Sequence, residues 1–438
     1  MRGHARLNET DRKFAWRAVS TITRTTAQTL TRPTVEALRA ALPAALARAL
    51  EAALAAVPTH VEVWAVGGAV RDLVLGRAIV DLDLATSGDP GPLAEAAAVA
   101  LAGTVEGYPQ FGTASAVGEA GRLDFARLRR ESYSRPGALP VPEFDATIEE
   151  DLARRDFSVN AIALGVAGVR QGEVVDPLGG LADLQARRLR VLHAGSFEDD
   201  ATRIWRGARY AARLGLRAEP QTLAQIREGA RGLAGISGER IWAEFERTAA
   251  EPVPGRVLAL LEGWGALEAS APGLRLHPTA ARVLRRRRGP LDVAVLFAVV
   301  TAPLDEREAI CERLAAPREA ARAAHAAATL IGLPRLGPEE LATCEGASDA
   351  ALQAARWLDP VRQRGVLRAL RRWERTRPLL NAADLEGLGV PVGPALGEWL
   401  RRLRAAHYLG TLRTAAAARR AVREALDGAP AQAQKESR

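Results

Sequence analysis

The sequence predicts an α/β head followed by an all-α remainder. Short apolar or alternating runs, which are typical of β-strands, cluster between about residues 60 and 176. After Asp176 these strand signals vanish, and the chain continues as amphipathic Ala/Leu/Arg segments interrupted by proline and glycine. With 438 residues, the chain is long enough for several domains of this kind.

Four segments of the head have strand patterns. Residues 61–66 (VEVWAV) form an apolar run that stops at Gly67, as a buried strand would. Residues 79–86 (IVDLDLAT) and 122–128 (RLDFARL) alternate apolar with polar side chains, and 159–166 (VNAIALGV) is another apolar run. We therefore expect these four segments to form most of one sheet.

The other segments have helical or polar patterns. Residues 34–57 are Ala/Leu-rich with helical spacing, and residues 1–32 are polar and expected to be loosely ordered. We divide the chain into an N-terminal extension (1–45), a head (46–176), a helical neck (177–265), a helical body (266–345), a helical tail (346–428) and a disordered end (429–438).

Composition limits the function classes. Only two cysteines are present, which excludes a disulfide framework or a cysteine-based zinc site. No apolar run reaches the roughly 18 residues of a membrane span, and the N-terminus lacks the apolar core of a signal peptide, so we expect a cytoplasmic protein. The net charge of +8 favours nucleic acid as a partner, although an arginine-rich genome could also produce it.

Two glycines follow the first strand run. Gly67 and Gly68 stand between a strand and a helical pattern, where a bare backbone can approach a phosphate and the helix N-terminus favours an anion. Arg71 and Asp72 follow within the first helical turns. A tight turn with an ion pair is the alternative interpretation of the same residues.

Three carboxylates lie on predicted strands. Asp81 and Asp83 are two residues apart, so their side chains project from the same face of a strand. Such a pair repels unless a cation lies between the carboxylates, and Mg²⁺ is the usual one at phosphate sites. Asp124 on a neighbouring strand is a third candidate, and the three would suit two-metal phosphoryl transfer. The alternative is an acidic edge strand without a ligand.

These motifs resemble those of a known family. The segments GGAVRDLVLGRAIVDLDLAT (67–86) and IEEDLARRDFSVNAIAL (148–164) are similar to the first two motifs of class II tRNA nucleotidyltransferases and bacterial poly(A) polymerases. The resemblance continues in order through four further segments, DPLGGLADL (176–184), FEDDATRIWRGARYAARLGL (197–216), GISGERIWAEF (235–245) and LLNAADLEGLGVPVGPALGEWLRRL (379–403).

The resemblance implies a polymerase-β-like nucleotidyltransferase head followed by an all-α neck, body and tail. It implies a Mg²⁺-dependent enzyme that adds C and/or A to tRNA 3′ ends from CTP and ATP, releasing pyrophosphate. Its partners would be the tRNA acceptor arm and 3′ end, with no membrane and no obligate protein partner. CC-only, A-only and poly(A) synthesis share these motifs, so they stay open. A non-catalytic RNA-binding protein is the alternative from another class.

The same resemblance implies roles for individual residues of the head. Asp81 and Asp83 would hold the metal, with Asp124 as a third catalytic acid. The residues that would contact the nucleotide or its phosphates are Gly67, Gly68, Arg71, Arg155 and Asn160. For Arg155 the alternative interpretation is a surface ion-pair cluster.

An arginine stripe follows in the predicted neck. On one helix Arg203, Arg206, Arg209 and Arg213 would lie within a stripe of about 120°, and Asp200 would lie close enough to brace Arg203. A carboxylate accepts from the amino group of cytosine or adenine while an arginine donates to a ring acceptor, so this pair could reject uracil and guanine. The alternative is a solvated basic face.

The family motif adds detail to this hypothesis. The resemblance implies that Asp199, Asp200 and Arg203 replace a nucleic-acid template, and that Arg206 and Arg209 point toward the nucleotide or its phosphates. Two basic segments, 284–290 and 366–377, would contact the RNA backbone unless they are simply solvated helix faces.

Two features bear on which nucleotides are added. Residues 129–150 depart from the longer loop pattern of the family, which puts the switch from C to A addition in doubt. The sequence has no His-Asp dipeptide, which disfavours the phosphohydrolase domain that some relatives carry.

Overall fold

The computed structural model describes residues 32–79, 81–132, 141–332 and 337–427. The expectations about residues 1–31 and 428–438 fall outside this part of the chain, as do residues 133–140 of the departing segment 129–150. The chain divides into two compact units. The first holds the described residues up to Leu276 together with Leu284–Leu291 and Glu312–Ala315, and the second holds the remainder.

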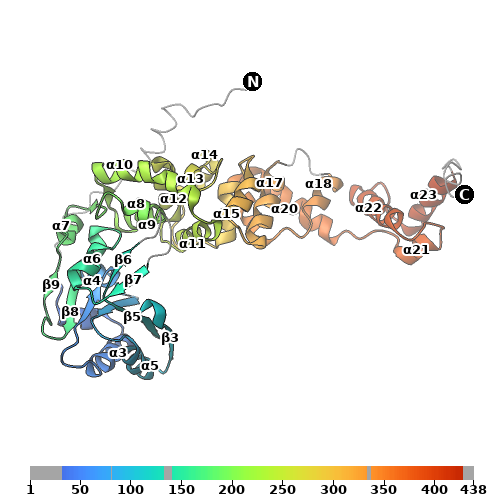
Figure 1. Ribbon diagram of the computed structural model, residues 1–438. Coiled ribbons are helices and arrows are strands. Elements are labelled where there is room, and N and C mark those ends of the chain that lie inside the picture. Colours follow the sequence, from blue (N-terminus) through green and yellow to red (C-terminus); the bar gives the residue numbers. More distant parts are fainter. Residues whose placement is uncertain (1–31, 80, 133–140, 333–336, 428–438) are drawn as a thin grey trace, which may run out of the picture. The chain divides into compact units, whose positions relative to one another are not determined.

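A seven-stranded sheet forms the core of the first unit (Figure 1). Its strands, in spatial order, are β3 (Thr104–Tyr108), β4 (Thr113–Gly118), β5 (Gly121–Arg127), β2 (Asp81–Thr86), β1 (Val63–Val66), β8 (Ala163–Ala167) and β9 (Val174–Val175). Only β2 and β5 pair in parallel. The strands expected at 61–66, 79–86 and 122–128 are confirmed as β1, β2 and β5.

The fourth expected strand begins later than its apolar run. The first residues of the run lie in a short 3₁₀ turn, η2 (Ser158–Asn160), and the strand β8 starts only at Ala163. The run is apolar except for Asn160 because both the turn and the strand are buried. Periodicity cannot separate a buried turn from a buried strand, which explains the shift.

Other strands were missed. The sheet strands β3 and β4 contain glycine, alanine and threonine and lack the large apolar residues that marked the other strands. The pair β6 (Arg129–Ser132) and β7 (Val141–Phe144) is antiparallel, and β10 (Arg188–Leu189) with β11 (Arg217–Ala218) is parallel. The last pair shows that the expectation of no strands after Asp176 was wrong.

Helices cover the sheet, and two of them precede its first strand. The expected helix at 34–57 is present as α2 (Val35–Ala41) and α3 (Ala44–Ala55), separated at Pro43, whose missing N–H interrupts the helix. The helix α3 packs against α5 (Gly91–Leu101), and both contact β5 (Figure 1). The boundary that we expected at 45/46 thus falls inside a helix that packs on the sheet.

A helical region completes the first unit. Its elements are α4 (Gly68–Val74), α6 (Ile148–Ala153), α7 (Gly180–Gln185), α8 (Ser196–Asp199), α9 (Arg203–Leu214), α10 (Pro220–Gly229), η3 (Ala230–Gly235), α11 (Gly238–Ala249), α12 (Pro254–Trp264) and α13 (Ala266–Ser270). The helix α9 packs on α12, and the buried Trp205 donates to Ser270 Oγ at 3.0 Å.

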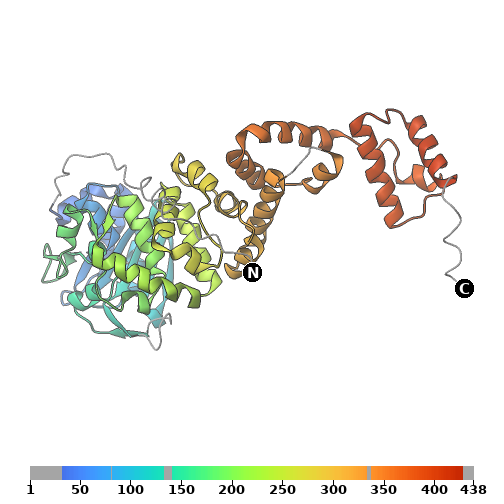
Figure 2. The same ribbon diagram turned by 90° about the horizontal axis from the view of Figure 1, so that it is seen from above.

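The second unit is helical in its described residues, coloured from yellow to red in Figure 2. Its helices include α15 (Val293–Thr301), α16 (Arg307–Arg313, partly in the first unit), α17 (Arg318–Gly332), α18 (Pro338–Thr343), α19 (Asp349–Leu358), α20 (Pro360–Arg375), α21 (Ala382–Glu386), α22 (Pro394–Leu409) and α23 (Ala415–Asp427). One cluster of buried side chains is centred on Trp373 and Tyr408, and a second on Leu385 and Val422. In the part of the chain that the structure describes, no helix combines the length and apolar character of a membrane span.

Candidate active site

Two adjacent strands bring the three predicted carboxylates together. Along β2 the burial alternates, so Asp81 and Asp83 face solvent on one side while Leu82 packs into the core. In the parallel pairing of β2 with β5, Asp83 lies opposite Asp124 and Asp81 lies opposite Arg122. Residues opposite each other share a face of the sheet, so the three acids form one negatively charged patch.

The surroundings of Asp83 make its ionisation unfavourable. Burial by neighbouring groups raises the pKa of the Asp83 carboxyl, although part of the side chain stays accessible. The positive charges of Arg155 and Arg71 oppose this rise of the pKa, whereas the negative charges of Asp124 and Asp81 add to it. A carboxylate whose charge is disfavoured by its neighbours is suited to receive a cation.

Asp124 is already engaged within the sheet. Its Oδ1 accepts from the hydroxyl of Ser115 on β4 and, at 2.7 Å, from Nε of Arg122. Among the described residues, no three His, Cys, Asp or Glu side chains are grouped as metal ligands. Because Asp124 is already paired with Arg122, its role as a third catalytic acid stays a prediction, and so does metal binding by Asp81 and Asp83.

The glycine turn lies beside these carboxylates. Gly67 has φ +67°, a left-handed conformation, and the helix α4 begins immediately afterwards at Gly68. A Cβ atom on Gly67 would lie 2.9 Å from Nη1 of Arg155 and 3.9 Å from Oδ2 of Asp83. The backbone conformation therefore favours glycine, and the turn, Arg155 and Asp83 meet at one place.

Arg71 is held in position by two partners. Its guanidinium is 4 % exposed and forms a bidentate ion pair with Asp72, through contacts of 2.9 and 3.1 Å. Its Nη1 donates to Oδ1 of Asn160 at 2.6 Å. Asp72 thus forms the ion pair that the sequence left as an alternative, and that pair orients the guanidinium next to the glycine turn.

Asn160 continues this network toward α9. Its Nδ2 donates to Oδ1 of Asp156 at 3.1 Å, and Oδ2 of Asp156 lies 2.9 Å from Nη2 of Arg206. Burial alone would raise the pKa of Asp156, but the charge of Arg206 and the donors Asn160 and the Phe157 amide hold it below its usual range. A chain of polar contacts therefore joins the head to the arginine helix.

Arg155 belongs to an ion-pair cluster and also lies beside the glycine turn, so it is compatible with both interpretations of this residue, a nucleotide contact and an ion pair. It donates to Oδ2 of Asp151 at 3.0 Å, while Arg154 contacts Oδ1 of the same carboxylate at 2.6 Å and pairs with Glu131. Burial would raise the pKa of Asp151, but the two arginines hold it below the usual range. This ion-pair cluster is thus present, and it places one Arg155 nitrogen next to Gly67.

The expectation that Asp200 and Arg203 share a helix was wrong. Asp200 follows α8 in an extended conformation, and α9 begins only at Arg203. The Asp200 carboxylate accepts from the amide and hydroxyl of Thr202 at 3.0 and 2.7 Å, and from Nη2 of Arg240 at 2.9 Å. The i,i+3 spacing suggested that Asp200 would brace Arg203, whereas its carboxylate accepts from Arg240, which tertiary packing brings close.

The other members of this motif also have fixed partners. Arg203 is buried, with its Nη1 donating to Ser196 Oγ at 2.6 Å and its Nη2 donating to the carbonyl of Arg154 at 3.2 Å. Asp199 lies 3.5 Å from the imidazole of His193. Arg203 therefore ties α9 to the ion-pair cluster of the head.

The arginine stripe is not a solvated basic face. Arg209 is buried and paired with Glu244 at 2.9 Å and with Glu251 at 3.5 Å, and Arg213 lies 3.4 Å from Glu251. These pairs join α9 to α11 and the residues after it. Arg206 is the more exposed of the stripe residues proposed to reach the nucleotide.

An open cavity of about 570 Å³ lies between α9 and α11. It is lined by Asp200, Thr202, Arg206, Arg209, Tyr210, Arg240, Ala243, Glu244 and Arg247. Three of the predicted site residues thus share one cavity. The α11 residues among its lining were not predicted, because their place beside α9 depends on how the two helices pack and not on the spacing within the segment GISGERIWAEF.

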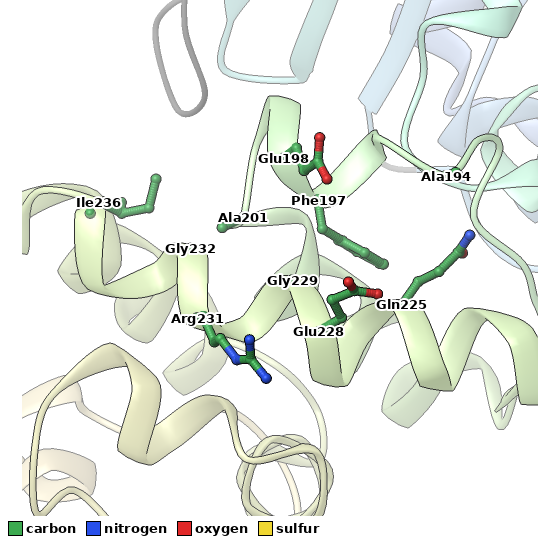
Figure 3. Close-up of a pocket in the computed structure, with 11 residues that line it drawn as sticks. Ala194, Phe197, Glu198, Ala201, Gln225, Glu228, Gly229, Arg231, Gly232 and Ile236 are labelled. Carbon is green, nitrogen blue, oxygen red and sulfur yellow. The ribbon is translucent and has the colours of Figure 1, made fainter.

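A second cavity of about 420 Å³ opens elsewhere in the first unit (Figure 3). Phe197 and Glu198 from α8 line one side, and the opposite side is formed by α10 and η3. None of the predicted site residues belongs to its described lining. It is therefore separate from the carboxylate patch and the arginine helix.

Comparison with known proteins agrees with this arrangement. Residues 63–190 match the Poly A polymerase head domain, and residues 215–276 match a family described as the probable RNA and SrmB-binding site of polymerase A. The chain is 37% identical over 371 residues to a CC-adding tRNA nucleotidyltransferase of Deinococcus radiodurans, an alignment that covers 84% of this chain and 91% of that protein. The chain belongs to the tRNA nucleotidyltransferase and poly(A) polymerase family.

Other relatives extend this assignment. A multifunctional CCA protein of Paracidovorax citrulli is 31% identical over 78% of this chain and 96% of its own length. An apo CCA-adding enzyme shares the fold with a TM-score of 0.70 at 23% identity, covering 90% of this chain and 99% of that one. The Thermotoga maritima CCA-adding enzyme, solved with tRNA, has a TM-score of 0.63 at 23% identity, covering 91% and 99%. The polymerase-type head followed by helical domains is thus confirmed for this tRNA nucleotidyltransferase homologue.

Proposed function

We propose that this protein is a template-independent tRNA nucleotidyltransferase that adds C to tRNA 3′ ends from CTP. The observation that supports it most strongly is the meeting of Asp83, the Gly67 turn and Arg155 at the end of β1. A carboxylate, a bare backbone and a guanidinium at one place match the needs of a metal-bound triphosphate. The names of the full-length relatives support tRNA as the acceptor.

The roles of the residues follow from their positions. Gly67, Gly68 and Arg71 would contact the triphosphate, and Arg155 would contact phosphate or ribose. Asp81 and Asp83 would hold Mg²⁺, which fits the raised pKa of Asp83 and the pairing of its strand with that of Asp124. When bound, the ion would neutralise phosphate charge and favour ionisation of the attacking hydroxyl.

The chain itself would orient the reacting groups. The 3′-hydroxyl oxygen of the tRNA attacks the α-phosphorus of CTP, and the bond to pyrophosphate breaks. In the cavity between α9 and α11, Asp200 would accept from the amino group of the base. Arg203 has a buried guanidinium, so it would act indirectly, by holding the start of α9 in place beside this cavity. These roles, and a location in the cytoplasm, are proposals.

Addition of A after CC is the second candidate. A multifunctional CCA protein aligns with 96% of its length, which favours the complete CCA end. The higher identity to a CC-adding enzyme, 37% against 31%, favours C addition alone. We therefore take C addition as the proposal and A addition as an outcome of its test.

One experiment separates these possibilities. The protein is incubated with Mg²⁺, single NTPs and three tRNAs that end before the CCA sequence, after CC and after CCA, and the products are sized. We expect CTP to extend the first tRNA by two nucleotides, and Asp83→Asn to abolish this extension. Extension of the second tRNA by ATP would show full CCA addition, and repeated A addition would show poly(A) synthesis. Binding without extension of any tRNA would favour the non-catalytic RNA-binding protein.

A further inference from the structure

An arginine cluster without carboxylate partners lies on the first unit, outside the site described above. It consists of Arg256 in the first turn of α12 and of Arg285, Arg286 and Arg288 in the loop that begins at the end of α14 (Pro278–Arg285). None of these four arginines forms an ion pair within the described residues. The three loop arginines are exposed. Arginines of the active-site region, such as Arg155, Arg209 and Arg240, are by contrast ion-paired.

The backbone holds this loop against the start of α12. Gly289, with φ +85°, donates from its amide to the carbonyl of Pro252 at 2.9 Å, and the Leu291 amide donates to Ala249 at 2.8 Å. A Cβ atom on Gly255 would lie 2.6 Å from the carbonyl oxygen of Leu284. The loop and the helix therefore approach so closely that only glycine fits at position 255.

This approach brings like charges together. Arg288 lies near enough to Arg256 for its charge, after burial, to lower the pKa of the Arg256 guanidinium. The Nε atom of Arg256 is buried and has no hydrogen-bond acceptor in the described structure. Among the described residues, Arg288 donates to the carbonyls of Arg285 and Arg287 alone, at 3.2 and 3.1 Å. An anion bound beside the accessible ends of these guanidiniums would relieve the repulsion.

We propose that Arg256, Arg285, Arg286 and Arg288 bind phosphates of an RNA backbone. Four guanidiniums are more than one free phosphate can contact, whereas the successive phosphates of an RNA strand could contact all of them. The segment 278–291 contains no aromatic residue, so it offers nothing on which a base could stack. The helix α12 also begins without a side-chain cap, which adds a positive helix terminus to the site. The identity of the RNA as tRNA rests on the proposed function.

The test is the salt dependence of tRNA binding by the full-length protein. The variant Arg285→Gln/Arg286→Gln/Arg288→Gln is compared with Arg32→Gln/Arg48→Gln/Arg217→Gln, which removes the same charge from exposed positions elsewhere in the first unit. Each lost phosphate contact should reduce the slope of log Kd against log salt by roughly 0.7 to 0.9. We expect a reduction of roughly two for the loop variant, and roughly one for Arg256→Gln, with little change for the control.

Two further measurements separate the loss of positive charge from other effects of the substitutions. The matched Arg→Lys variant at the three loop positions should keep most of the slope because it keeps the charge, and the KM for CTP should be unchanged in every variant. Equal slopes for the loop variant and its control would overturn the proposal and leave an acidic protein as the better partner for this cluster. Absence of nucleotide addition by the unmodified protein would instead refute the proposed function, while its tRNA binding would still decide the role of the cluster.

Discussion

The Arg71 guanidinium donates a hydrogen bond of 2.6 Å to Asn160, across 89 positions of the sequence. Through Asp156, Asn160 is linked in turn to Arg206 on α9. The proposed triphosphate residue of the head and the proposed nucleotide-selecting helix are thus parts of one buried polar network. A change in the middle of this network should affect both ends.

Replacing Asn160 by Ala should lower kcat/KM for CTP by about ten- to a hundredfold. The substitution removes a hydrogen bond to a charged group, which contributes roughly 1.5–3 kcal/mol. The Arg71 guanidinium could then move away from Gly67 and Gly68. Steady-state kinetics of C addition measure the effect. The matched control is Asn381→Ala, which removes the cap of α21 in the second unit and should leave kcat/KM unchanged. Equal kinetics for the two variants would contradict a role for the network.

Replacing Gly67 by Ala should cost both stability and activity. With φ +67° and ψ −125°, Gly67 lies in a backbone region that other residues rarely occupy, which costs an alanine on the order of 1–3 kcal/mol, and the Arg155 guanidinium would have to shift away from the new Cβ. The control is Gly172→Ala, where φ is +83° but nothing lies within 4 Å. Both variants should lower Tm, and only Gly67→Ala should also lower kcat. Full activity of Gly67→Ala would show that the turn does not need to approach Arg155 closely.

Replacing Arg240 by Ala should relax the choice among the four NTPs, as Asp200→Ala should. The Arg240 guanidinium donates to the Asp200 carboxylate at 2.9 Å, so its loss leaves the proposed base acceptor less firmly oriented. Ratios of kcat/KM for the four NTPs measure the choice. Arg247→Ala is the control, because it lines the same cavity but pairs with Glu244. Full discrimination by both Asp200→Ala and Arg240→Ala would refute this assignment of the base-selecting wall.

The Asp156→Asn variant should be less stable than the unmodified protein at neutral pH. The folded-state pKa of Asp156 lies below its ordinary value, so its charge stabilises the fold above that ordinary value, near 3.8. This contribution is lost as the pH falls through the lowered pKa. The difference in Tm between the two proteins should therefore be largest near pH 7 and shrink as the solution becomes strongly acidic. A difference that stays constant with pH would show that packing, and not the charge, is responsible.

The fold was predictable where the sequence pattern is local. The strand β1 is a continuous apolar run, whereas β2 and β5 alternate apolar with polar residues. The two-residue spacing alone places Asp81 and Asp83 on one face of β2. The strands β3 and β4 were missed because their stability comes from pairing within the sheet and not from strongly apolar side chains. The helix α3 was recognised, but its membership of the head depends on packing against α5.

By itself, the sequence determined the α/β head, the helical remainder, and the residue types that a nucleotidyl-transfer site requires. Only the tertiary structure decided which of these residues meet. Asp200 pairs with Arg240, 40 positions away, and the Arg209 charge is neutralised by Glu244, 35 positions away. Spacing along one helix reveals only neighbours three or four residues apart, whereas a buried charge selects its partner from every element that packs around it.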